Sequence, residues 1–197
     1  MINIDVKKCA SLLKEYDNYL ILSHRHPDGD TLGSAFALKR ALDLLGKKSM
    51  VRCNDEMADK FSYLWQNLDN SEIKFDKIIA VDVADKKLLG EDFETKYGDN
   101  VFLCIDHHMS NREYAENLLL EDRAAAAVVI YEVICQLGVE ITPELLFDNG
   151  IVKQVENGGV KILGNGEVTK AFTVKANAFS KSAQAKIEAA GGRVEGI

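Results

Sequence analysis

Acidic and imidazole side chains gather in three short clusters of this sequence. Residues 24–30 read HRHPDGD, residues 81–85 read VDVAD with Asp82 and Asp85, and residues 106–108 read DHH. All four histidines lie in the first and third clusters, and no cysteine lies within any of the three. Carboxylates and imidazoles suit a transition metal such as Mn²⁺ better than a soft thiolate site would. The three clusters therefore predict a metal site.

A pair of cations held by such ligands would serve the hydrolysis of a phosphate ester. One carboxylate can bridge two metals about 3.5–4 Å apart, and the pair stabilises the attacking and leaving oxygens of an in-line displacement at phosphorus. Bound metals also lower the pKa of water. Gly29 and Gly33 permit a tight turn into a helix that begins near Thr31. The N–H groups at that helix N-terminus would add a site for an anion.

Each cluster taken alone has a structural alternative. A single His-Asp pair at a strand end is more often a capped loop than a ligand pair, and Asp85 would serve equally as an ordinary N-cap. His26 and Arg25 fit loop positions better than ligand positions. Three clusters at successive strand ends, which together hold every histidine, favour the metal site.

The segments around the clusters alternate between strand-like and helix-like patterns. Buried strands are predicted at residues 19–23, 49–53, 77–83 and 101–105. Helices are predicted at residues 5–16, 31–45, 57–68 and 124–137, with Asp5 as an N-cap and Gly46 and Gly138 as C-terminal glycines. This alternation predicts an α/β fold with a doubly wound, mostly parallel sheet, in which ligands bind at the carboxyl ends of the strands.

The pattern changes in the last third of the chain. Thr142 and Pro143 open a short helix that Gly150 closes. Glycine-punctuated strands at residues 151–155, 159–163 and 170–176 follow, with a turn at 164–166, a helix at 180–190 and a final strand at 193–197. We therefore expect a domain at residues 1–146 and a small C-terminal α/β module at residues 147–197.

Composition bounds the class of protein. The chain has 47% apolar and 28% charged residues, as expected for a soluble globular protein, and no apolar run approaches the length of a membrane span. Without a signal peptide, and with four cysteines lacking CxxC spacing, a reduced cytoplasmic protein is expected. Residues 1–150 carry net charge −10 and residues 151–197 carry +3. The basic end indicates either a polyanion partner or an ordinary solvated face.

The motifs HRHPDGDTLGS, VDVAD and IDHHMSN resemble the first three motifs of the DHH phosphoesterase superfamily. The segment DRAAAAVVIYEVICQLGVEITPE resembles the helix that follows them, so the resemblance covers about residues 5–146. The most similar groups are the bacterial oligoribonuclease/pAp phosphatases and the RecJ-type and cyclic-dinucleotide phosphodiesterases. The resemblance implies a hydrolase that cleaves phosphodiester or phosphomonoester bonds of short RNA or DNA oligonucleotides or of pAp-like nucleotides.

The resemblance also implies a role for each motif residue. Two Mn²⁺ ions would share one carboxylate, the first held by His24, Asp28 and Asp82 and the second by Asp30, Asp82 and His107. Asp106 would orient the histidines, and His108 would face the substrate phosphate. A fourth motif, G-I-x-T-D-T-G, is broken here, since Gln154 stands where its metal-binding Asp is expected and Lys153 lies beside it. Both changes predict a weaker second metal and reduced activity.

The C-terminal residues resemble a different family. GVKILGNGEVTKAFTVKANAFSKSA followed by KIEAAGG is similar to the C-terminal part of bacterial large-subunit ribosomal protein fifteen, and the likeness begins near residue 141. It implies a contact with ribosomal RNA through the tail. The chain therefore reads as a chimera with a junction near residues 141–146. A phosphoesterase, a ribosomal RNA-binding fragment and a non-functional hybrid are the functions that follow from this reading.

Overall fold

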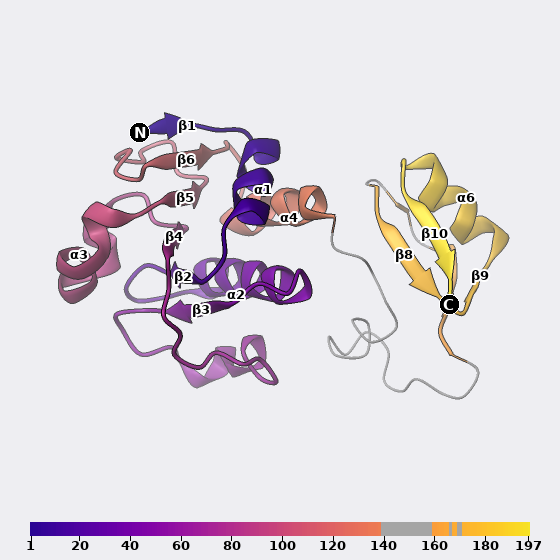
Figure 1. Ribbon diagram of the computed structural model, residues 1–197, viewed down its shortest axis with the longest axis horizontal. Coiled ribbons are helices and arrows are strands. Elements are labelled where there is room, and N and C mark those ends of the chain that lie inside the picture. Colours follow the sequence, from indigo (N-terminus) through magenta and orange to yellow (C-terminus); the bar gives the residue numbers. More distant parts are fainter. Residues whose placement is uncertain (139–158, 166, 169–170) are drawn as a thin grey trace. The chain divides into compact units, whose positions relative to one another are not determined.

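The computed structural model describes residues 1–138, 159–165, 167–168 and 171–197. The chain divides into two compact units, Met1–Leu137 and Gly138–Ile197 (Figure 1). The domain boundary expected at residue 146, the helix and strand expected within residues 142–155, and Gln154 lie outside the described residues. No helix among the described residues combines the length and the apolar character that a membrane crossing requires.

The first unit is built on one six-stranded sheet in which every pair of neighbours is parallel. The spatial order is β1-β6-β5-β4-β2-β3. The strands are β1 (Ile2–Asn3), β2 (Tyr19–Leu22), β3 (Ser49–Arg52), β4 (Lys77–Val81), β5 (Leu103–Asp106) and β6 (Asn117–Leu120). The α/β fold with a mostly parallel sheet, predicted from the sequence, is confirmed.

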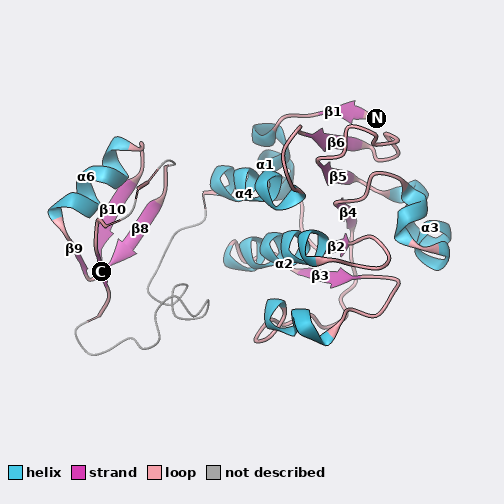
Figure 2. Ribbon diagram, turned by 180° about the vertical axis from the view of Figure 1, so that it is seen from behind, coloured by secondary structure: helices cyan, strands magenta, loops and turns pink. Residues whose placement is uncertain are grey.

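Helices cover both faces of the sheet. Figures 1 and 2 show α1 (Val6–Glu15), α2 (Gly29–Leu44) and α4 (Ala126–Leu137) on one face, while α3 (Glu91–Tyr97) lies on the other. The chain runs from β2 to β3 in one direction across the sheet and from β4 to β5 in the opposite direction. Since crossovers between parallel strands are right-handed, the reversal places α2 and α3 on opposite faces.

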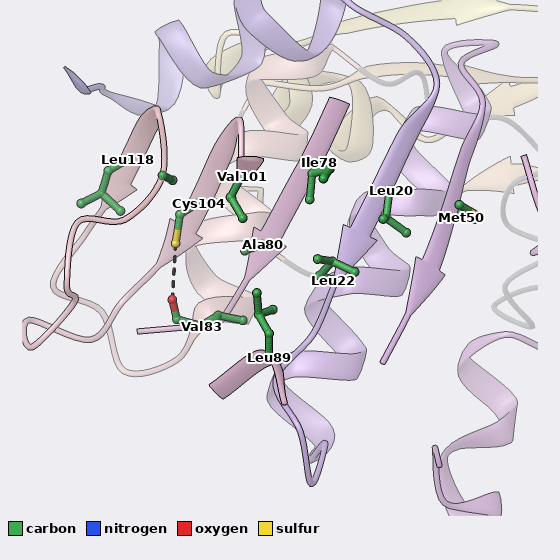
Figure 3. Close-up of a cluster of buried hydrophobic side chains, with 11 residues drawn as sticks. Leu20, Leu22, Met50, Ile78, Ala80, Val83, Leu89, Val101, Cys104 and Leu118 are labelled. Atoms are coloured by element: carbon green, nitrogen blue, oxygen red, sulfur yellow. Dashed lines mark hydrogen bonds between the residues drawn. The ribbon is translucent and has the colours of Figure 1, made fainter. Parts of the chain in front are cut away.

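The strand residues alternate between two apolar cores. Tyr19 points toward α1, where its hydroxyl donates to the carbonyl oxygen of Leu13 at 3.1 Å. Phe93 and Tyr97 of α3 pack against the opposite core. Figure 3 shows that core, which consists of Leu20, Leu22, Met50, Ile78, Ala80, Val83, Leu89, Val101, Cys104, Ala115 and Leu118. Burial on both faces explains why these strands read as continuous apolar runs.

Local signals placed most helix ends correctly. Asp5 caps α1 by accepting from the backbone N of Lys8 at 2.7 Å. Gly46 and Gly138 follow α2 and α4 with φ of 72° and 68°, the left-handed conformation that glycine adopts at low cost. The helix predicted at residues 57–68 is wrong, because the structure has only a 3₁₀ helix, η1 (Asp59–Leu64), in that segment. Sequence analysis also missed β1, β6 and α3.

The second unit holds two small parallel pairs of strands. β7 (Lys161–Ile162) pairs with β9 (Ala178–Phe179), and β8 (Thr173–Ala176) pairs with β10 (Arg193–Gly196). The helix α6 (Lys181–Ala189) begins after Ser180, whose hydroxyl accepts from the backbone N of Ala183 at 3.1 Å. The predicted helix and final strand are confirmed. The described part of the second unit buries few apolar residues: Val160, Val174, Ala176, Ala183 and Ile187.

Candidate metal centre

The three polar clusters meet at one edge of the sheet. They follow the carboxyl ends of β2, β4 and β5, which are neighbours in the order β5-β4-β2. The chain turns from β2 to β3 on one side and later returns to β4 on the other. Ligands of open parallel sheets bind at such a reversal of strand order. The topology therefore puts the predicted metal residues where a ligand is expected.

Asp82 occupies the middle of the site. Its side chain is only 4% exposed, its backbone φ is 61°, and its Oδ1 atom has no hydrogen-bond partner. Burial raises the pKa of Asp82 to about 6, and the charge of Asp30 adds to the rise, while the nearby His24 and His108 oppose it. A buried carboxylate without a full set of partners is costly unless a cation compensates it. Asp82 thus has the environment of a metal ligand.

His24 and Asp28 flank Asp82 on the β2 side. The Nε2 atom of His24 lies 3.7 Å from Asp82 Oδ2 and 3.8 Å from Asp28 Oδ1. The Nδ1 atom of His24 lies 2.7 Å from the carbonyl oxygen of Arg25, which assigns the ring proton to Nδ1 and leaves the Nε2 lone pair facing the carboxylates. Asp28 is held as the N-cap of α2, accepting from the backbone N of Thr31 at 3.1 Å. These three residues could hold one cation.

His107 reaches Asp82 from the β5 side. Its Nε2 atom lies 3.5 Å from Asp82 Oδ1 and 3.8 Å from Asp30 Oδ2. Its Nδ1 atom lies 3.0 Å from the carbonyl oxygen of Arg123, so the same tautomer is favoured as in His24. Asp82, His107 and His108 form a second group whose ligand atoms lie within reach of one cation. The two groups share Asp82.

Asp30 lies beside the second group but outside both sets of three close ligand atoms. Its Oδ2 accepts from the backbone N of Ala126 at 2.9 Å, and its Oδ1 accepts from the backbone N of Ala127 at 2.9 Å. Asp30 therefore contacts the first turn of α4 as well as His107. Nothing in the sequence pattern indicates this long-range contact.

Asp106 holds the DHH segment together from a fully buried position. Its Oδ1 atom lies 2.8 Å from Nδ1 of His108 and accepts from the backbone N of His107 at 2.8 Å. Its Oδ2 accepts from the side-chain amide of Asn111 at 2.7 Å. Sequence analysis gave no role to Asn111, although it belongs to the motif IDHHMSN. Burial lowers the pKa of His108, but its hydrogen bond to Asp106 and the charges of Asp106, Asp82 and Asp30 outweigh burial and raise it overall.

The other residues of the clusters serve the loops. Asp85 is the N-cap of the 3₁₀ helix η2 (Lys86–Leu89) and accepts from the backbone N of Lys87 at 3.0 Å. His26 is largely exposed, and its Nδ1 lies 2.9 Å from a carboxylate oxygen of Asp55. Neither side chain belongs to the two groups of close ligand atoms.

The residues present fit a divalent cation. Two imidazole Nε2 atoms, each fixed by a carbonyl oxygen on the other ring nitrogen, face a buried carboxylate with an unpartnered oxygen. Carbonyl or carboxylate partners of this kind orient histidines that bind metals.

The chain resembles a number of solved structures, among them the following two. An exopolyphosphatase-related protein from Bacteroides fragilis matches with a TM-score of 0.55 and 19% identity, over 68% of this chain and 44% of that one. Exonuclease RecJ, in a structure bound to manganese, matches with a TM-score of 0.43 and 16% identity, over 67% of this chain and 37% of that one. The first likeness supports the fold of the first unit. The chain spans less than half the length of each.

The C-terminal part matches a second family. The sequence model that describes the 50S ribosomal proteins L15 and L18e and their 60S counterpart matches residues 123–195. The large ribosomal subunit protein uL15 of Thermosipho africanus (strain TCF52B) is 60% identical over 60 residues, which are 30% of this chain and 40% of that protein. The resemblance of the tail to this ribosomal family is confirmed.

The larger match covers the metal centre. The sequence model of the DHH family, N-terminal domain, matches residues 18–154, which include all three clusters and overlap the ribosomal match at residues 123–154. With the parallel sheet and the polar residues at its carboxyl edge, this match leads to one conclusion: the chain belongs to the DHH family, and its C-terminal part is similar to ribosomal protein uL15.

Proposed function

We propose that the protein is a metal-dependent phosphoesterase that hydrolyses phosphodiester or phosphomonoester bonds of short oligonucleotides or pAp-like nucleotides. The observation that carries the proposal is the convergence of His24, Asp28, His107 and His108 on the buried, incompletely partnered Asp82. Membership of the DHH family supports the same chemistry.

His24, Asp28 and Asp82 would hold one cation, and Asp30, Asp82 and His107 would hold the other. When bound, such cations would offset the charge of the phosphate and lower the pKa of a water molecule, so that hydroxide would be available to attack phosphorus. We propose Mn²⁺, because mixed imidazole and carboxylate ligands suit it. The protein would supply the tautomers of His24 and His107 that their carbonyl partners favour, and the buried position of Asp82.

His108 would act on the substrate directly. Its Nδ1 is engaged by Asp106, which leaves Nε2 to exchange a proton with a substrate oxygen. Against the effect of burial, the hydrogen bond to Asp106 and the nearby carboxylates raise the pKa of His108, a direction that favours the proton-carrying ring that a general acid for the leaving oxygen requires. Asp106, itself held by Asn111, would keep the ring in place.

We expect this activity to be reduced in the chain. The fourth motif has Gln154 where the family has a metal-binding Asp, and Lys153 adds a positive charge beside it. A neutral amide in place of a carboxylate weakens the attraction for the second cation. One cation should therefore bind more tightly than the other, and calorimetry with Mn²⁺ would resolve the two affinities.

The test of the proposed function is the Mn²⁺-dependent release of mononucleotides from a short RNA, with Asp82→Ala as the control variant. We expect slow release by the native sequence and none by the variant. Equal release by both proteins would overturn the proposal. Turnover as fast as that of intact family members would overturn the expected impairment alone.

Binding to ribosomal RNA through the tail is a second candidate, favoured by the 60% identity over 60 residues to uL15. Its test is co-sedimentation of the full chain with large ribosomal subunits at increasing salt. Binding that weakens steeply with salt would support a contact with phosphates. Absence of the chain from the pellet at low salt would exclude this candidate.

A further inference from the structure

The segment just before α4 and the first turn of that helix contact the metal centre through backbone atoms. The carbonyl oxygen of Arg123 lies 3.0 Å from Nδ1 of His107. The backbone N atoms of Ala126 and Ala127 each donate to the carboxylate of Asp30 at 2.9 Å. Residues 123–127 thus contact two residues of the centre, one from each side of Asp82.

The contact with Asp30 gives two backbone donors the partners that they would otherwise lack. Ala126 is the first residue of α4, and the first amides of a helix have no acceptor within the helix. A carboxylate at this position also interacts favourably with the positive end of the helix dipole. Asp30 itself belongs to the first turn of α2, so its side chain ties the starts of α2 and α4 together across 96 residues.

The contact with Arg123 determines which ring nitrogen of His107 carries the proton. A carbonyl oxygen can only accept a hydrogen bond, so Nδ1 of His107 must donate, and Nε2 must present its lone pair toward Asp82 and Asp30. Moving Arg123 would free the ring to turn away from Asp82. The position of the residues before α4 therefore controls a candidate metal ligand.

We infer that residues 123–127 are the outer support of the metal centre and position Asp30 and His107 for the cations. This inference rests on the proposed function and adds that cation affinity depends on where α4 begins. The support comes from N–H and C=O groups, so the run of alanines at residues 124–127 contributes without any functional side chain. The same residues lie where the DHH and ribosomal matches overlap.

Amide hydrogen exchange in metal-free protein tests the contact itself. First-turn amides exchange rapidly unless a side chain protects them, so protection of the amides of Ala126 and Ala127 in the full chain is expected. Asp30→Ala should abolish that protection. The amide of His107, which bonds to Asp106, should stay protected and serves as the internal control. Unprotected Ala126 and Ala127 amides in the native chain would overturn the inference.

Calorimetric titration with Mn²⁺ tests the consequence. Ala126→Pro removes one donor to Asp30 at the first helical position, where proline is tolerated, and Ala126→Gly keeps the donor as the matched control. We expect about tenfold weaker affinity for Ala126→Pro than for Ala126→Gly, since outer partners of metal ligands typically contribute about 10–100-fold. Equal affinities of the two folded variants would overturn the inference.

The two experiments separate this inference from the proposed function. Suppose that the native chain binds no Mn²⁺ but that Asp30→Ala abolishes the protection of the Ala126 and Ala127 amides from exchange. The proposed metal centre is then overturned, while the contact of Asp30 with the start of α4 is supported. If Ala126→Pro does not fold, by circular dichroism, the exchange measurement decides the inference. If the native chain binds Mn²⁺ but the amides of Ala126 and Ala127 are not protected from exchange, the metal centre is supported and the inference about residues 123–127 is overturned.

Discussion

Residues 1–138 and residues 159–197 use their polar side chains in different ways. In the first region, carboxylates and imidazoles from three strand ends converge on Asp82, which stays buried with one oxygen unpartnered. In the second, the charged side chains pair near the surface, as Glu195 does with Arg193 at 2.6 Å and with Lys175 at 3.5 Å. Ser180 caps α6 and also accepts from the backbone N of Gly164.

This difference indicates which region would carry the proposed chemistry. Buried groups of like charge raise the energy of the folded chain, and such arrangements are kept where a ligand or a reaction uses them. Paired surface charges and caps need no ligand, because their partners lie within the fold. The described residues of the second region contain no group of three potential metal ligands. The proposed metal chemistry is therefore assigned to the first region.

The largest expected effect is that of Asp82→Asn. It removes the charge shared by both candidate cation sites, and cations supply several kcal/mol of transition-state stabilisation, so Mn²⁺-dependent hydrolysis should fall on the order of 1,000-fold or more. In metal-free buffer at pH 8, the variant should melt at a higher temperature than the native chain. The reason is that the substitution removes the buried negative charge of Asp82, which lacks a full set of partners. Hydrolysis assays and thermal melts check both. A lower melting temperature in metal-free buffer would contradict the cost assigned to Asp82.

His108→Gln comes next. Loss of the proposed general acid should lower kcat by about 100-fold or more, while KM changes little. Asp85→Asn is the matched control in a neighbouring loop, because Asp85 only caps a 3₁₀ helix. Steady-state kinetics with a short RNA measures the changes in kcat and KM separately. A change confined to KM would show that His108 binds substrate without transferring a proton.

Core substitutions should separate the stability of the two regions. Ile79→Ala, at a fully buried position of the central strand β4, should cost about 2–5 kcal/mol and abolish metal binding at moderate denaturant. Ile187→Ala, at 3% exposure in α6, should destabilise the second region and leave Mn²⁺ affinity unchanged. Denaturant unfolding followed with bound Mn²⁺ distinguishes these outcomes. Weaker Mn²⁺ binding by Ile187→Ala in native buffer would mean that the regions are coupled.

Gly192→Ala probes the packing of the second region alone. An added Cβ would lie 2.5 Å from the carbonyl oxygen of Phe172, so the backbone just before β8 must shift. Overpacking of this kind typically costs about 1–3 kcal/mol. Gly196→Ala is the control, since nothing lies within 4 Å of its added Cβ. Amide exchange in β8 and β10 should rise only in the first variant, and equal exchange in both would contradict the close approach.

The smallest effect is expected for Glu195→Gln. It removes surface ion pairs with Arg193 and Lys175, which typically contribute about 0–1 kcal/mol. The melting temperature should change little, and less in high salt than in low salt. A loss as large as that of Gly192→Ala would show that the charges of the second region matter more than surface pairing allows.

Local signals in the sequence determined much of the first region. Continuous apolar runs predicted β2 through β5, and the caps at Asp5, Gly46 and Gly138 placed helix ends within a few residues. These features depend on neighbouring residues only, so a single sequence suffices to find them. The placement of polar clusters after strands was equally visible. Short or marginal elements such as β1 and η1 were missed or misjudged, because tertiary packing rather than local preference forms them.

Only the tertiary structure decided how the clusters meet. The order β5-β4-β2 makes Asp82 the central residue, and that order arises from pairings between strands far apart in the chain. Likewise, the contact of Asp30 with Ala126 and Ala127 joins two helix starts 96 and 97 residues apart, and no local pattern encodes it. The sequence by itself supplied the ligand types and their strand ends. The folded sheet supplied their convergence, because distances between remote residues are set by packing and pairing across the whole domain.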